Sequence, residues 1–136
     1  MALVSEMMNR SLVTVSPDAS MAEAVRVVQR TGAEHVLVMD EHTLVGILCA
    51  CELRGARPDD RVSSRMSGNV ATVRPDVRVE EAAALLSACS LGCLPVAVGG
   101  LIIGTLSEAE LARAGVSEPR PHCRQKHRAR ARALRA

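Results

Sequence analysis

Two short stretches of this sequence place a hydroxyl or thiol side chain three residues before a carboxylate. Ser107 precedes Glu110 in one stretch, and Cys49 precedes Glu52 in the other. In both stretches an apolar run and a glycine come first, which is the pattern of a strand that leads into a helix. Side chains of these types can bind a ligand where the helix begins. They can also form a capping box, in which each side chain accepts a hydrogen bond from a backbone N–H.

The two stretches belong to an internal duplication with an offset of 58 residues and no gap. Apolar residues also replace one another at many further positions of the two copies. A duplication of this kind predicts two copies of one supersecondary unit, which bury their apolar faces against each other. The identical pairs include Met8 and Met66, Thr14 and Thr72, Val15 and Val73, Pro17 and Pro75, Asp18 and Asp76, Glu23 and Glu81, Ala24 and Ala82, Val38 and Val96, Gly46 and Gly104, Leu48 and Leu106, Glu52 and Glu110, and Leu53 and Leu111.

Each copy is expected to fold as β-α-β-β-α. A short strand at 12–15 or 70–73 ends at a proline and an aspartate, and a helix follows. Ser20 predicts a cap at the start of the first helix, and Gly32 predicts its end. Two strands joined by a turn come next, and a short helix closes each copy. The expected strand pairs are 36–39 with 44–48, and 94–98 with 101–106.

The predicted fold is therefore α/β (α+β), with two β-α-β-β-α repeats packed as a pseudo-two-fold pair. Neither repeat is large enough to cover both faces of its own sheet, so the two must pack together. The composition changes at two points, which predict a linker and a tail. The expected boundaries are 5–56 for the first repeat, 57–64 for the linker, 65–115 for the second repeat and 116–136 for a basic, disordered tail.

The composition restricts the class of function. The 136 residues are 48% hydrophobic and 24% charged, which is typical of a globular domain. They include no Phe, Tyr or Trp, so the protein has no aromatic platform for sequence-specific binding of single-stranded nucleic acid. No apolar run approaches the roughly 20 residues of a membrane span. Five cysteines without a C-x-x-C pair predict a reduced, cytoplasmic protein.

The small net charge of +2 hides an uneven distribution. Residues 120–136 contain 7 of the 17 basic residues and no acidic residue, so residues 1–119 hold 10 basic and 15 acidic residues, a net charge of −5. A basic tail can attract nucleic acid or an acidic partner surface, and salt weakens that attraction. It can equally be a solvated, disordered end.

The motifs of the duplicated unit resemble those of the CBS domain, which is named after cystathionine β-synthase. Each copy carries Met-x-x-x-x-x-Thr-Val-x-Pro-Asp near its start, from Met8 and from Met66. The second copy adds Leu94-Pro95-Val96, followed by an apolar-apolar-Gly strand and a terminal acid. The resemblance covers roughly residues 5–115 and implies a stand-alone CBS pair. It further implies a dimer and adenosine nucleotide binding in the clefts between the repeats.

The resemblance also implies which residues bind the nucleotide. In the family the last strand is followed by Gly-apolar-x-Thr/Ser-x-x-Asp, where the hydroxyl contacts phosphate at a helix N-terminus and the aspartate binds the ribose hydroxyls. Glutamate replaces this aspartate in both copies, and a thiol, a weak donor, replaces the hydroxyl in the first. The preferred site is therefore in the second repeat (Thr72, Leu94, Pro95, Gly104, Ser107 and Glu110), and the weaker one is in the first (Thr14, Val36, Leu37, Gly46, Cys49 and Glu52).

Other interpretations of the reactive residues compete with nucleotide binding. Ser107 and Glu110 need no ligand if they only cap a helix. Cys49 and Cys51 match no structural zinc spacing, so packing explains them better than a metal site. No set of nucleophile, base and orienting residue can be assembled, so no enzymatic activity is expected.

The sequence thus predicts a cytoplasmic, homodimeric regulatory module. It would bind AMP, ADP, ATP or S-adenosylmethionine as a regulatory ligand and signal to an unknown protein partner. One alternative is a dimeric interaction scaffold that binds no ligand. The other is a nucleic-acid-associated protein that acts through residues 120–136. Neither a membrane nor a required cofactor is expected.

Overall fold

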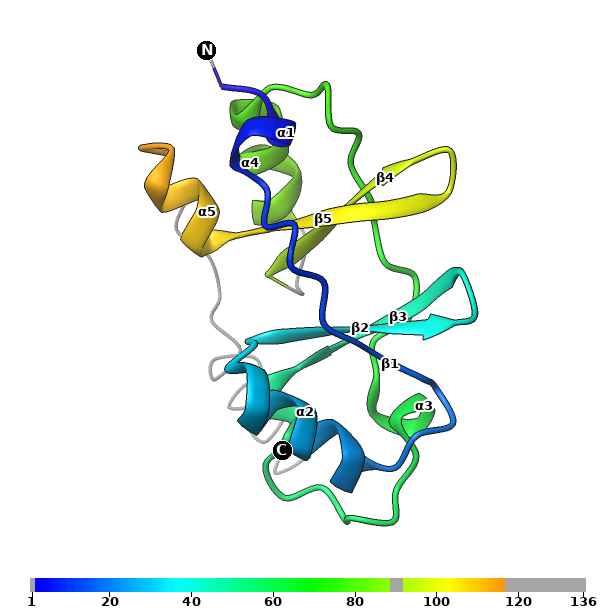
Figure 1. The fold of residues 1–136 in the computed structure, drawn as a ribbon. Coiled ribbons are helices and arrows are strands. Elements are labelled where there is room, and N and C mark those ends of the chain that lie inside the picture. The colour runs from blue at the N-terminus through cyan, green and yellow to red at the C-terminus, as the bar shows by residue number, and fades with distance from the viewer. Residues whose placement is uncertain (1, 89–91, 117–136) are drawn as a thin grey trace, which may run out of the picture.

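The structure is a computed structural model and describes residues 2–88 and 92–116. Over these residues the chain forms short helices and strands in two similar halves (Figure 1). The helical elements are α1 (Val4–Met7), α2 (Met21–Thr31), the 3-10 helix η1 (Ala50–Leu53), α3 (Val62–Arg65), α4 (Val79–Ala88) and α5 (Glu108–Arg113). The strands are β1 (Thr14–Val15), β2 (His35–Asp40), β3 (Thr43–Cys49), β4 (Cys93–Val98) and β5 (Leu101–Ser107). No described helix combines the length and apolar character needed to cross a membrane.

The two sheets have the same connectivity. In the first, β1 runs parallel to β2, and β2 pairs with β3 as an antiparallel hairpin. In the second, β4 and β5 form the hairpin, and a single parallel bridge between Val73 and Val96 takes the place of β1. The register shifts between Val38 and Met39 in one hairpin and between Val96 and Ala97 in the other, at equivalent positions. The predicted pair of repeats is confirmed, although the expected strand at 70–73 is reduced to that bridge.

The sheets face each other in the middle of the molecule, and the helices cover their outer sides (Figure 1). Alternating residues of β2 show why this arrangement buries both faces of the strand. Val36 and Val38 pack with Met21 and Ala24 of α2 in one apolar cluster. Leu37 points the other way and joins residues of both hairpins in a cluster between the sheets. That inter-sheet cluster consists of Leu37, Ile47, Cys93 and Ile102.

Local signals in the sequence explain where these elements begin and turn. The Ser20 hydroxyl accepts a hydrogen bond of 3.2 Å from the Glu23 N–H, which is the predicted cap of α2. Gly32 ends that helix with a φ of 72°, a left-handed conformation that glycine adopts without strain. In the second hairpin the two turn residues, Gly99 and Gly100, have φ values of 56° and 84°.

The segment at the start of each repeat packs against the other repeat, and we did not predict this exchange from the sequence. We call residues 2–9 the N-terminal strap and residues 60–67 the central strap. The Val4 N–H donates to Val77 O at 2.9 Å, and the Asn9 N–H donates to Thr105 O at 2.8 Å, so the N-terminal strap belongs to the second repeat. Figure 1 shows this segment running from α1 beside α4 to β1 in the other half. The equivalent bonds of the central strap are Val62 N–H to Ala19 O (2.8 Å) and Ser67 N–H to Ile47 O (2.9 Å).

The straps add two helical turns that were not expected. α1 belongs to the N-terminal strap, and α3 lies across the end of the predicted linker 57–64. Val4 and Val62 occupy equivalent places in them, and each is completely buried in the outer cluster of the opposite repeat. The linker is therefore part of the packed structure of the first repeat.

Candidate functional site

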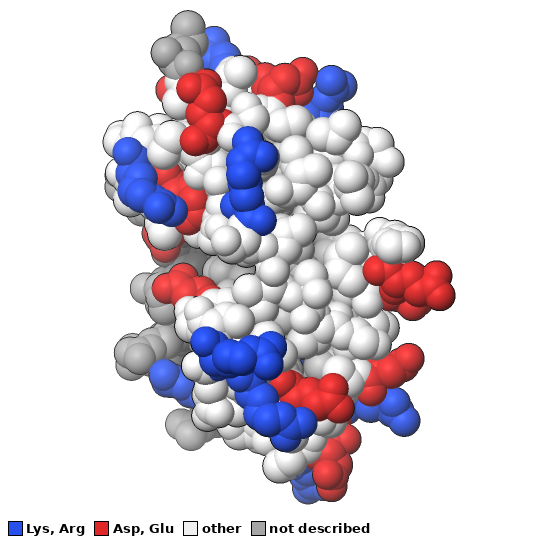
Figure 2. All heavy atoms as spheres, viewed as in Figure 1, with Lys and Arg blue, Asp and Glu red and all other residues white. Residues whose placement is uncertain are grey.

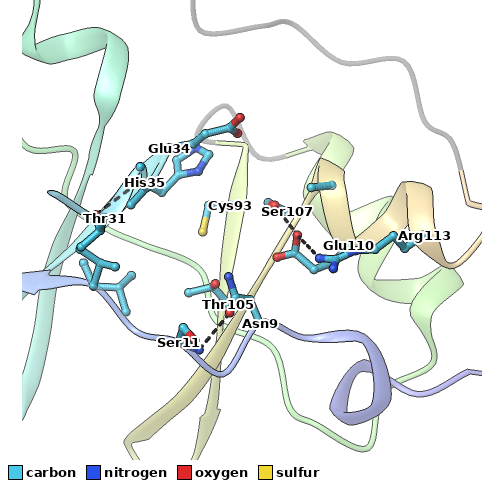
Figure 3. Close-up of a pocket in the computed structure, with 15 residues that line it drawn as sticks. Asn9, Ser11, Thr31, Glu34, His35, Cys93, Thr105, Ser107, Glu110 and Arg113 are labelled. Carbon is cyan, nitrogen blue, oxygen red and sulfur yellow. Dashed lines mark hydrogen bonds and ion pairs between the residues drawn. The ribbon is translucent and has the colours of Figure 1, made fainter. Parts of the chain in front are cut away.

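A cavity of about 320 Å³ lies between the two repeats. One wall comes from the second repeat, at the start of β4 and at the junction of β5 with α5. Asn9 of the N-terminal strap pairs with Thr105 and belongs to this wall. The facing wall comes from the first repeat, where residues 11–13 precede β1 and residues 31–37 join α2 to β2. Figure 3 shows these side chains around the common space. The cavity depends on both repeats, so its shape changes if the repeats move relative to each other.

Ser107, Glu110 and Arg113 form a connected polar group on the second-repeat wall. The Ser107 hydroxyl donates a hydrogen bond of 3.0 Å to Glu110 Oε2, and Arg113 Nη2 lies 3.4 Å from the same oxygen. Glu110 is only 4% exposed, whereas the Arg113 side chain is 67% exposed. The group therefore holds a buried carboxylate at the cavity wall, with its cation toward solvent.

The second oxygen of the buried carboxylate is the notable feature of this wall. Both contacts to Glu110 within the described residues end on Oε2, and none reaches Oε1. Figure 3 shows the carboxylate directed into the cavity. A ligand that brings a hydroxyl or N–H donor to this oxygen would form a hydrogen bond with it.

The capping-box interpretation of Ser107 and Glu110 is wrong in this structure. Ser107 is the residue before α5, but its side chain makes no hydrogen bond to the backbone of the helix. Its hydroxyl donates to Glu110 instead, because an ionised carboxylate can only accept. The spacing of three residues thus brings the two side chains together at the cavity.

The structure separates the residues that were predicted to form one site in each repeat. Of the preferred set, Ser107 and Glu110 line the cavity, and the other four do not. Leu94 is buried in the outer apolar cluster, and Thr72 is exposed on the surface. Of the weaker set, only Leu37 lines this cavity, because the facing wall belongs to the first repeat. The residues of the two sets outside the lining are Thr72, Leu94, Pro95 and Gly104, and Thr14, Val36, Gly46, Cys49 and Glu52.

The two motif glycines have a packing role. A Cβ at Gly104 would lie 2.6 Å from Met8 Sδ, and a Cβ at Gly46 would lie 2.6 Å from Met66 Sδ. Each methionine belongs to a strap from the opposite repeat. Glycine is therefore needed at these two strand positions because a strap packs directly against each of them.

Several lining residues were not identified from the sequence. They are Asn9 and Ser11 before β1, Glu34 and His35 at the start of β2, and Arg113 in α5. The prediction placed the clefts between the repeats but took all the residues of each site from one repeat, so the first-repeat residues were assigned to the other cleft. A usable signal was present: Val4 and Ser5 are identical to Val62 and Ser63 at the same offset, which extends the duplication into the straps.

The equivalent junction in the first repeat differs in chemistry and conformation. β3 leads into the 3-10 helix η1 there, and Cys49 Sγ lies 3.2 Å from Cys51 Sγ. Cys51 is disulfide-bonded, so the expectation that every cysteine is reduced is wrong for this residue. No group of three or more His, Cys, Asp and Glu side chains in the described ranges is placed to hold a metal ion.

The face of the molecule shown in Figure 2 gives little support to a nucleic-acid interface. Acidic and basic side chains are interspersed over both halves of the face in Figure 2, with a band of uncharged residues between them. The basic segment 120–136, which carries that prediction, lies outside the described residues.

Comparisons with known proteins agree with the architecture. A family model described as "CBS domain" matches twice, over residues 4–59 and 62–117. The chain is 29% identical over 114 residues to a homoserine O-acetyltransferase of Methanohalobium evestigatum, covering 81% of this chain and 23% of that protein. It is 22% identical over 121 residues to an uncharacterized protein of Methanocaldococcus jannaschii, covering 87% of this chain and 46% of that protein. The chain thus spans less than half the length of either curated relative.

Solved structures with the same fold contain adenosine compounds. The CBS domain pair of protein MJ0100, in complex with 5′-methylthioadenosine and S-adenosyl-L-methionine, superposes with a TM-score of 0.78 at 22% identity, over 85% of this chain and 96% of that chain. CBSX2 in complex with AMP gives 0.74 at 24% identity, over 85% and 96%. The cytosolic domain of the Mg2+ channel MgtE in complex with ATP gives 0.71 at 27% identity, over 79% and 46%.

Proposed function

The chain belongs to the CBS domain family, with two CBS domains in tandem, and we propose that it is a non-enzymatic module that binds an adenosine compound in the cavity between them. Occupancy of the cavity would then be signalled to a protein partner. The expected homodimer, the partner and the cytoplasmic location come from the sequence and stay predictions.

The observation that carries this proposal is the buried carboxylate of Glu110. Its Oε1 faces the cavity and lacks a partner among the described residues, while Ser107 and Arg113 hold Oε2. A ribose offers two adjacent hydroxyl groups, and either can donate to such an oxygen. A charged acceptor makes the stronger kind of hydrogen bond. The adenine would lie against the aliphatic wall that contains Val13 and Leu37.

The position of the cavity explains how binding could be communicated. A ligand there touches the second repeat through Glu110 and the first through residues 11–13 and 31–37. It therefore favours arrangements of the repeats in which both walls reach it at once. A difference in affinity between two arrangements is sufficient to shift the equilibrium between them.

The absence of aromatic residues makes the first test simple. With no Trp, Tyr or Phe, the protein itself absorbs very little near-ultraviolet light, so a copurified purine would dominate the spectrum. Isothermal titration calorimetry with adenosine, AMP, ADP, ATP and S-adenosylmethionine would follow. We expect at least one of them to bind with one molecule per cavity. Absence of heat with all five, together with no purine absorbance, would favour the scaffold that binds no ligand.

A pair of matched variants would test the site itself. Glu110→Gln keeps the size of the side chain but removes the charge, and we expect it to weaken binding about tenfold, or about 1.4 kcal/mol. Glu52→Gln makes the same change at the equivalent position of the first repeat, which does not line this cavity. It should leave the affinity unchanged. Equal losses in the two variants, or a loss only in Glu52→Gln, would place the ligand elsewhere.

A further inference from the structure

We infer that this cavity selects an adenosine compound without phosphate, whose 5′ substituent is neutral or cationic, such as a thioether or a sulfonium. The inference rests on the proposed function and adds the chemical class of the ligand. It depends on the charge of the cavity walls, on the hydroxyl groups that line them and on the size of the space.

The charged residues of the walls favour a ligand that is not an anion. Glu34 and Glu110 are the acidic residues of the lining, and Arg113 is its only arginine or lysine within the described residues. Arg113 already lies 3.4 Å from Glu110 Oε2, so its charge offsets that carboxylate. Counting histidine as neutral, Glu34 leaves the walls with a net charge of −1. A dianionic phosphate would add to this negative charge, whereas a sulfonium would oppose it.

Of the four hydroxyl side chains of the lining (Ser11, Thr31, Thr105 and Ser107), Thr31 and Ser107 are already committed as donors. Ser107 donates its single hydroxyl proton to Glu110, and Thr31 donates its own to Val27 O at 2.7 Å. A hydroxyl has one proton to donate, so neither group can also donate to phosphate without breaking its present bond. At Ser107 that change would leave a carboxylate oxygen and a phosphate side by side. Ser107 occupies the position of the hydroxyl that contacts phosphate in the family, and here its side chain is oriented toward Glu110.

The size of the cavity points in the same direction. Its volume of about 320 Å³ is near the lower end of the range for small-molecule sites, roughly 300–1,000 Å³. Such a space suits a nucleoside with a short 5′ substituent better than a triphosphate chain. It does not separate AMP from S-adenosylmethionine, whose substituent is larger than one phosphate, so that preference rests on charge alone. Glu34 is exposed at the first-repeat side of the lining. A long polyanionic substituent that left the cavity on this side would pass this carboxylate.

Calorimetry on the full chain at one fixed, low salt concentration would test the selection. We expect adenosine, 5′-methylthioadenosine and S-adenosylmethionine to bind more tightly than AMP by at least about tenfold, and ATP to bind more weakly than AMP. Added salt should narrow the difference between adenosine and AMP, because it screens charges at the cavity mouth. AMP or ATP binding as tightly as adenosine would overturn the inference and leave the proposed function intact. No binding by any of the five compounds would overturn both.

A matched pair of charge variants would show whether the walls cause the selection. Glu34→Gln removes one negative charge from the lining, and we expect the ratio of AMP affinity to adenosine affinity to rise about threefold. Glu81→Gln removes the same charge from the exposed surface of α4, outside the lining, and should change neither affinity. The ratio of AMP to adenosine affinity is the quantity to compare. The same ratio in both variants and the parent protein would overturn the electrostatic origin of the selection.

Discussion

The thioether of Met8 lies directly over Gly104 of the opposite repeat. A Cβ on the glycine would come 2.6 Å from Met8 Sδ and 3.0 Å from the backbone oxygen of Asn9. The same contact recurs between Met66 and Gly46, where the distance to Sδ is again 2.6 Å. Each strap thus crosses the opposite sheet at the one residue that leaves room for it. This contact packs each strap against the sheet of the opposite repeat.

Replacing Gly104 should therefore weaken the packing between the repeats. We expect Gly104→Ala to destabilise the protein by about 1–3 kcal/mol, because Met8 and the backbone of Asn9 must both move. The free energy of unfolding can be measured by urea denaturation followed by circular dichroism.

Gly68→Ala is the control for this prediction. A Cβ there would meet only Val45 O, at an ordinary distance of 4.0 Å. In the Met8→Ala background Gly104→Ala should also be less destabilising, which a double-mutant cycle would measure as coupling. A loss at Gly104 no larger than the loss at Gly68 would contradict the role of this contact.

The sequence was informative about the fold because its strongest signals are local. Ser20 and Gly32 define the ends of α2 through their own backbone and side-chain geometry, and both predictions are confirmed. The offset of 58 residues identified the two repeats without any knowledge of their packing. Residues 70–73 carry a pattern typical of a strand, yet only Val73 forms a bridge, to Val96. Such pairing depends on the tertiary arrangement more than on propensity.

The composition of the candidate site was harder to predict because it depends on contacts between the repeats. Ser107 and Glu110 were identified, since the motif brings them together within one turn of chain. Asn9 and Glu34 lie far from them in sequence and join them only through the exchanged packing of the repeats. No local pattern states which repeat contributes the second wall. The sequence also could not predict that Ser107 donates to Glu110, because a capping box has the same spacing of three residues.

The exchanged straps predict that both repeats unfold together. Val4 and Val62 are fully buried, each in the opposite repeat, so Val4→Ala and Val62→Ala should each destabilise the protein by about 2 kcal/mol. Because each strap bridges the halves, we expect one cooperative transition in both variants, measured by thermal denaturation with circular dichroism. Val98→Ala is the control, since Val98 is 51% exposed and its removal should have little effect. A first transition confined to one half would show that the straps do not couple the repeats.

An ion pair between Asp60 and Arg65 predicts a pH dependence of stability. Arg65 donates hydrogen bonds of 2.9 and 3.2 Å to Asp60 Oδ2, and these bonds, with the charge of the guanidinium, lower the pKa of the aspartate. A carboxyl group with a lower pKa in the folded state stabilises the protein above its unfolded pKa. This stabilisation is lost as the pH falls through the folded pKa. The pair is partly exposed, so the effect is expected to be small.

Asp60→Asn should accordingly lower the urea midpoint at neutral pH, and the difference from the parent protein should disappear in acid. The equivalent position in the N-terminal strap is Ala2, so the second repeat offers no matching pair. Arg65→Gln should raise the pKa of Asp60 toward its ordinary value, which a carboxyl-detected NMR titration would measure. Asp59→Asn is the neighbouring control for the change in net charge. An Asp60 pKa that does not change in Arg65→Gln would contradict this assignment.

The hydrogen bond from Ser107 to Glu110 predicts that stability and ligand binding depend on one hydroxyl group. Ser107→Ala leaves the buried Oε2 with only the exposed Arg113, so we expect a loss of about 1–2 kcal/mol in stability. The carboxylate would also lose the contact that fixes its direction, and adenosine should bind about tenfold more weakly. Urea denaturation and calorimetry on the same variants would separate the two effects.

Ser107→Cys provides a graded form of the same test. It introduces the residue type that occupies the equivalent position of the first repeat, Cys49, and a thiol is a weaker donor than a hydroxyl. We therefore expect adenosine to bind most tightly to the parent protein, less tightly to Ser107→Cys and most weakly to Ser107→Ala. Cys49→Ser is the reciprocal control, and it should not change binding in a cavity that Cys49 does not line. Unchanged adenosine affinity in both Ser107 variants would show that Glu110 does not need this hydroxyl to meet its ligand.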